Sequence, residues 1–66
     1  MNITQSEFEY LKSELTTSII LILVEERNYT IEEAMSKVYS SKAYELLSNP
    51  ETGLFFQSPR YVLSYL

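Results

Sequence analysis

The chain of 66 residues contains no cysteine and no histidine, and none of its acidic residues is aspartate. Without cysteine it can form neither a disulfide nor a thiolate metal site, and without histidine it lacks the commonest general base and zinc ligand. One glycine and two prolines are too few for the many tight turns of an all-β barrel. The length allows one domain, residues 1–66, with a small core that would gain stability from a partner subunit.

Charge and hydropathy exclude other classes of protein. The net charge of −4 repels phosphate backbones and anionic lipids. The longest apolar run extends from Ile19 to Val24, far short of the roughly 20 residues that span a bilayer. The first residues lack the basic segment of a signal peptide, so we expect a cytoplasmic protein that makes no membrane contact.

Capping signals predict where helices begin. Thr4 followed by Glu7, and Thr30 followed by Glu33, both have the spacing of a capping box. Apolar residues recur at helical spacing after Thr4, which predicts a helix over residues 5–27, although the β-branched run at its end could also form a buried strand. Asn28 and Tyr29 then read as a turn.

The second half of the chain is predicted to hold shorter helices. The helix after Thr30 has an apolar face, formed by Ile31, Ala34, Met35 and Val38. The serine pair at 40–41 either ends it and caps a third helix or kinks one helix over residues 31–47. Residues 49–53 have turn chemistry, and Ser58 before Pro59 is typical of a helix start. Together, these signals predict an all-α fold, a small bundle of three to four helices with a long central first helix.

The first helix carries apolar residues on two opposite sides. One stripe consists of Phe8, Leu11, Leu15, Ile19 and Ile22. The other consists of Tyr10, Thr17, Leu21 and Val24, which have the spacing of a helix–helix seam. Either the later helices cover both sides, or the second stripe is the seam of a homodimer. The small size of the chain favours the homodimer, because few residues are left to cover two faces.

The residues do not assemble into a recognisable catalytic constellation. The serine–lysine neighbours at 36–37 and 41–42 point in different directions on a helix, and the adjacent glutamates at 25–26 and 32–33 suit solubility and capping. A single glycine permits no glycine-rich phosphate loop, and the alternating aspartates of a calcium loop are missing. We therefore expect a protein that is not an enzyme and needs no metal or cofactor.

DNA binding is the alternative function. Residues 30–49 resemble a helix-turn-helix in length and apolar spacing. The second helix would present Lys42 beside Glu45, however, whereas phosphate affinity needs several basic residues on one face. The five basic residues are instead scattered along the chain. Two packed helices without a nucleic-acid partner explain the pattern better.

Aromatic residues gather in the second half of the chain. Many of them should be core, but tyrosine is also enriched at protein interfaces. We expect Phe55 or Phe56, with Tyr61 or Tyr65, to form an exposed patch for a protein partner.

The carboxy-terminal half also carries a resemblance. Residues 38–47, VYSSKAYELL, followed by residues 50–58, PETGLFFQS, resemble a pattern in short uncharacterised helical proteins of bacteria. Some of those proteins are encoded beside toxin-like proteins, including ADP-ribosyltransferase-like ones. The resemblance transfers no active-site residue. It implies a small bacterial partner protein, antitoxin-like, whose role is binding.

Overall fold

The computed structural model describes residues 3–66, and this part of the chain is all-α, as predicted. Its elements, in order, are α1 (Gln5–Arg27), α2 (Ile31–Tyr39), α3 (Lys42–Leu47), the 3₁₀ helices η1 (Pro50–Thr52) and η2 (Leu54–Phe56), and α4 (Pro59–Leu63). The β-branched run at 19–24 lies within α1 and is therefore helical, not a strand. The long first helix expected from the sequence is confirmed with the bounds that its periodicity predicted.

Local hydrogen bonds fix both ends of α1. The Thr4 hydroxyl accepts from the Glu7 N–H at 3.1 Å, and the Glu7 carboxylate accepts from the Thr4 N–H at 2.9 Å, which completes the predicted capping box. At the other end Asn28 has φ 60°, in the left-handed region that asparagine tolerates better than most residues. Its N–H and that of Tyr29 both donate to the Leu23 carbonyl, so the helix ends here and the chain can reverse.

The helical conformation is interrupted between α2 and α3, at the serine pair Ser40–Ser41. Thr30 and Glu33 form the second capping box at the start of α2. The Ser41 hydroxyl donates to the Val38 carbonyl at 2.6 Å and accepts from the Tyr44 N–H at 3.0 Å. One serine thus satisfies the end of one helix and the start of the next, and the alternative of a single kinked helix is wrong.

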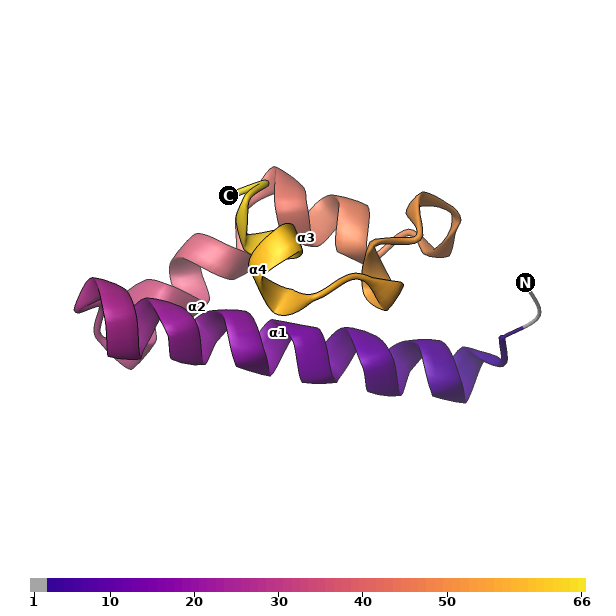
Figure 1. Cartoon of the computed structure of the whole chain (residues 1–66), viewed down its shortest axis with the longest axis horizontal. Coiled ribbons are helices and arrows are strands. Elements are labelled where there is room, and N and C mark those ends of the chain that lie inside the picture. The colour runs from indigo at the N-terminus through magenta and orange to yellow at the C-terminus, as the bar shows by residue number, and fades with distance from the viewer. Residues whose placement is uncertain (1–2) are drawn as a thin grey trace.

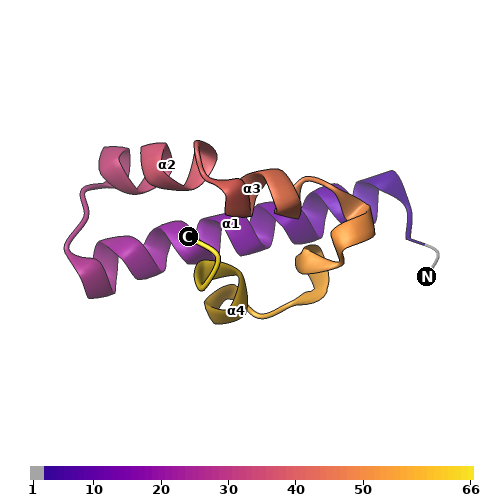
Figure 2. The ribbon, with the colours of Figure 1, turned by 90° about the horizontal axis from the view of Figure 1, so that it is seen from above.

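The helices α3 and α4 and the segment between them lie on one side of α1, whereas α2 begins beside the end of α1 and leads up to them (Figure 1). The helix α2 runs back along α1, and α3 continues on that flank, whereas α4 lies on the other flank (Figure 2). The molecule measures 38 × 18 × 17 Å, and its long dimension follows α1, since 23 helical residues span about 34 Å. The opposite side of α1 is covered by no other element of residues 3–66.

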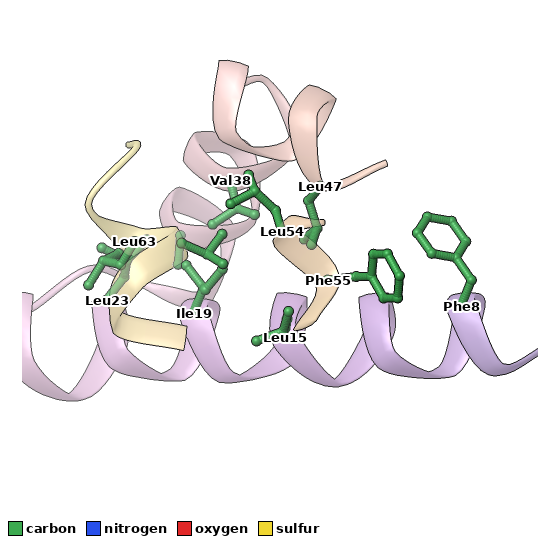
Figure 3. Close-up of a cluster of buried hydrophobic side chains, with 11 residues drawn as sticks. Phe8, Leu15, Ile19, Leu23, Val38, Leu47, Leu54, Phe55 and Leu63 are labelled. Carbon is green, nitrogen blue, oxygen red and sulfur yellow. The ribbon is translucent and has the colours of Figure 1, made fainter. Parts of the chain in front are cut away.

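The core lies in the layer between α1 and the elements above it (Figure 3). Every helix except η1 contributes at least one buried apolar side chain to this layer, and the buried cluster comprises Phe8, Leu15, Ile19, Leu23, Ala34, Val38, Leu47, Leu54, Phe55, Val62 and Leu63. The ring of Phe55 meets the ring of Phe8 edge to face, with 5.0 Å between centroids. The predicted apolar stripe of α1 is therefore its core face, although Leu11 and Ile22 are only half-buried.

The last helix is tied to the far end of α1 by an ion pair. Arg60 holds the Glu26 carboxylate with two hydrogen bonds, one of them 2.9 Å between Nη1 and Oε1. These bonds lower the pKa of Glu26. With Phe55 on Phe8 and Arg60 on Glu26, the carboxy-terminal segment contacts both ends of α1.

Candidate interaction surfaces

The second stripe of α1 faces solvent. Tyr10 is 63% exposed and Leu21 is 44% exposed, Thr17 is also exposed, and Val24 is half-buried. We call these four residues the α1 stripe. The expectation that later helices could cover both sides of α1 is wrong for Tyr10, Thr17 and Leu21, which stay exposed. Val24, at the edge of the stripe, packs against the core. An uncovered apolar stripe on a helix is a surface suited to another protein.

Polar groups interrupt the amino-terminal part of the α1 stripe. The Tyr10 hydroxyl donates to Glu14 at 2.9 Å, and this hydrogen bond raises the pKa of Tyr10, because loss of its proton would set a phenolate against a carboxylate. Glu14 occupies the seam position one turn before Thr17 and two turns before Leu21. The continuous apolar part of the α1 stripe is therefore its carboxy-terminal part, from Thr17 to Val24.

Helix α2 adds a second exposed stripe that the sequence reasoning missed. Ile31, Met35 and Tyr39 are 48%, 42% and 49% exposed. They are spaced by four residues and share one face of the helix, which we call the α2 stripe. The prediction that Ile31 and Met35 belong to the buried face is wrong, because only Ala34 and Val38 are buried. The spacing of four could have revealed the stripe, but nothing in the sequence shows which side of α2 meets α1.

The two stripes lie on the same side of the α1–α2 pair. A cleft of about 420 Å³ is lined by Ser13 and Thr17 of α1 and by Tyr39 of α2, which places Tyr39 next to the α1 stripe. Because the helices are antiparallel, Met35 and Ile31 lie at successive turns toward the end of α1 (Figure 2). They therefore lie at about the same levels along the helix axis as Leu21 and Val24.

The two phenylalanines of the predicted patch have different surroundings. Phe55 is 5% exposed and belongs to the core, whereas Phe56 is 48% exposed, so the structure selects Phe56 for the surface. Adjacent side chains of the 3₁₀ helix η2 point in different directions, so one ring is buried and the other is exposed. The two rings nevertheless remain in contact, with 4.3 Å between their centroids. The exposed member is thus supported from beneath by the buried one.

Phe56 separates two hollows on the surface. One, of about 330 Å³, has an apolar floor that includes Leu11, Leu15 and Pro59. The other, of about 440 Å³, is lined in part by Ile3 and Pro50. Each hollow is lined by a single charged residue, a glutamate in both, at position 14 in the first and position 51 in the second.

Tyr61 and Tyr65 form a separate exposed pair at the carboxyl end. Their hydroxyl oxygens lie 3.2 Å apart and their rings meet edge to face at 5.5 Å. This hydrogen bond raises the pKa of Tyr65. Val62 and Leu63, which lie between the two tyrosines in the sequence, are buried.

The charged groups with altered pKa have structural partners. The pKa of Glu7 is lowered by the backbone N–H of Thr4 in the capping box, and that of Arg60 is raised by Glu26. Among residues 3–66 there is no group of three or more acidic residues arranged to hold a metal ion.

Comparisons with known proteins add no relative from which a function could be transferred. No family model, no curated protein and no solved structure matches the chain. Within the part that the structure describes, none of the helices combines the length and the apolar character needed to cross a membrane. The candidate site is therefore defined by the geometry of the exposed apolar surfaces.

Proposed function

We propose that this chain is a small, non-catalytic protein–protein interaction module. The observation that carries the proposal is the exposure of eight large hydrophobic side chains, each at least 42% accessible, on a chain of 66 residues. Single exposed apolar residues are ordinary on a protein surface, but grouped ones mark contact sites. Here they fall into the two neighbouring stripes of α1 and α2, the Phe56 region and the tyrosine pair.

Phe56 is the anchor that we propose for a foreign protein partner. Aromatic side chains in a well-packed setting dominate the energy of many interfaces. Phe56 rests on Phe55 and has a hollow on each side, so a partner can surround the ring and fill both hollows. A cavity of about 150 Å³ is enough to hold a benzene ring, so each hollow can receive an apolar side chain of that size.

The charge around Phe56 favours a basic partner. Glu14 and Glu51 are the charged residues that line the hollows, and the whole chain has a net charge of −4. Opposite charges near an interface speed association and select partners more than they set affinity. This supports the antitoxin-like role suggested by the resemblance to bacterial proteins, with the partner presenting apolar side chains beside lysine or arginine.

Affinity capture with matched variants tests this proposal. The tagged chain, its Phe56→Ala variant and a Gln57→Ala control are used as baits in lysate of the source organism, with captured proteins measured by mass spectrometry. We expect a protein that the parent chain and the control enrich and that Phe56→Ala loses at least tenfold. Circular dichroism verifies that all three baits are folded. Equal capture by all three would contradict the role of Phe56.

DNA binding remains the second candidate, favoured only by the tight turn between α2 and α3. Its proposed recognition helix α3 has six residues, and Lys42 there pairs with Glu45 at 3.2 Å. Fluorescence anisotropy with labelled duplex DNA distinguishes the two functions. Affinity that falls steeply with salt would support a regulator, whereas no binding at low salt would reject it.

A further inference from the structure

We infer that the α1 and α2 stripes together form the face through which a second copy of this chain binds, giving a two-fold symmetric homodimer. The inference rests on the proposed function and specifies one of its partners. A homodimer seam on α1 alone would be short and one helix wide, because the polar residues Glu14 and Asn28 occupy the seam positions before Thr17 and after Val24. The α2 stripe supplies the width that α1 lacks.

The charge distribution favours a second copy over a foreign partner at this face. The apolar part of the α1 stripe and the α2 stripe contain no charged residue. Glu25 lies one turn after Leu21, at the edge of the α1 stripe. The cleft beside Thr17 and Tyr39 is lined by one charge of each sign, Glu9 and Lys12. A two-fold interface sets identical patches against each other, so any charge at its centre would meet its own copy. An uncharged centre avoids this repulsion. In the Phe56 hollows, by contrast, a glutamate with no basic residue beside it would meet its own copy.

The size of the face is consistent with a weak but specific dimer. The α1 stripe from Thr17 onward and α2 run side by side for about 13 Å, the length of the nine residues of α2, and two neighbouring helices present a width of about 20 Å. The accessible area of this face exceeds its flat length times width, because the side chains project from the helices. Together with the surface around Tyr10, about 500 Å² of accessible area per copy can be buried. This is about a tenth of the accessible surface of 4449 Å², and the total of about 1,000 Å² lies at the lower limit for specific complexes. We therefore expect dissociation at micromolar concentration.

The interface also explains why the residues are of these types. Leu21, Ile31 and Met35 provide aliphatic area, and Tyr39 is positioned at the edge, where its ring packs on Tyr44 and its hydroxyl can stay in contact with water. Two helices from each copy would then form a four-helix layer beneath the existing core. The α1 helix would be covered on both sides only in the dimer.

The test is molar mass by light scattering behind a sizing column, over a dilution series from about 1 mM to 1 µM, for the parent chain, Met35→Glu and Ser36→Glu. Met35→Glu places a charge in the α2 stripe. Ser36→Glu places the same charge one residue further, on the side of α2 that lines a different hollow. Each change enters a symmetric dimer twice, so we expect Met35→Glu to weaken dimerisation by at least about a hundredfold. Ser36→Glu should leave it within about threefold.

Several results would overturn the inference. A parent chain that stays at the monomer mass at 1 mM would exclude the dimer, and a dimer that Met35→Glu leaves intact would place the contact elsewhere. Circular dichroism of Met35→Glu must match that of the parent, and the exposed Leu21→Glu variant offers an independent disruption from α1.

Cysteine cross-linking gives a second readout that does not depend on stability. The chain has no cysteine, so a single introduced thiol has no competitor. In a two-fold dimer a residue near the axis lies close to its own copy, and disulfides form when the Cα atoms are about 4.4–6.8 Å apart. At low protein concentration, we expect at least one of Thr17→Cys, Leu21→Cys and Met35→Cys to form a disulfide-linked dimer, and Ser36→Cys to form none. If none of these three variants forms a disulfide-linked dimer, the homodimer is rejected. If Phe56-dependent capture of a partner is still observed, the proposed function as an interaction module is retained.

Discussion

The contrast between Phe55 and Phe56 yields a quantitative prediction about stability. Phe55 is 5% exposed and packs edge to face on Phe8, whereas Phe56 is 48% exposed. Replacing a buried phenylalanine by alanine costs about 3–5 kcal/mol, because the removed ring leaves a cavity. Phe56→Ala should cost about 1 kcal/mol, since it loses only its contact with Phe55 and partial burial.

These magnitudes are large compared with the stability of the whole chain. A domain of 66 residues has a free energy of unfolding of about 3–10 kcal/mol. Phe55→Ala therefore removes a third or more of the total and lowers the melting temperature by at least about 12 °C. Phe55→Leu restores most of the volume and should cost about 1.5 kcal/mol, so it remains folded even if the alanine variant does not.

Urea unfolding followed by far-ultraviolet circular dichroism measures the effect, because the chain has no tryptophan but is helical. The parent chain and the three variants are compared at one protein concentration below the dimer range. The reasoning predicts the order Phe56→Ala, Phe55→Leu, Phe55→Ala, from least to most destabilised. Equal destabilisation by the two alanine changes would refute the assignment of Phe55 to the core and Phe56 to the surface.

Three further predictions concern the cap of α2, the carboxyl end of α1 and the ion pair between α1 and α4. Thr30→Ala removes a hydroxyl that caps α2 and should lower the free energy of unfolding by about 1 kcal/mol in urea titration, with exposed Ser36→Ala as the control. Asn28→Ala should lower the melting temperature because alanine resists φ 60°, and Asn28→Gly should raise it; the opposite order would contradict the left-handed cap. Because Arg60 lowers the pKa of Glu26, their pair contributes stability above the ordinary glutamate pKa of 4.5 and loses it as the pH falls further. The stability difference between the parent and Arg60→Gln, measured in urea at several pH values, should therefore shrink in acid; a constant difference would contradict the pairing.

The sequence predicted the helices well because their signals are local. The capping boxes at Thr4 and Thr30 and the cap at Ser58 depend on residues within one helical turn, and all three form as expected. The bounds of α1 follow from the same signals and from a sustained apolar period. These features required no knowledge of which helix touches which.

The orientation of the short elements was not predictable for the same reason. Ile31 and Ala34 are both apolar, and only the position of α1 decides that Ala34 is buried. Residues 54–56 are all apolar, so no alternation of apolar and polar residues indicates that Phe55 is buried and Phe56 is exposed. The Glu26–Arg60 pair joins residues 34 positions apart, and no local pattern announces it.

The candidate site was predicted only in part. Among its proposed residues, Tyr10, Thr17 and Leu21 of α1 and the three exposed aromatic residues of the second half are accessible, whereas Phe55 is not. Whether any of them binds a partner stays a prediction. The α2 stripe was missed because its exposure depends on the packing of two helices.

The one-sided arrangement around α1 separates two kinds of evolutionary constraint. Core residues such as Ile19 and outward residues such as Leu21 project from opposite sides of a helix about 10 Å in diameter. Substitutions that far apart, with no shared neighbours, have nearly additive effects on stability. The outward face can therefore drift toward new partners while the fold is kept, and the same independence allows a designer to rewrite that face without touching the core.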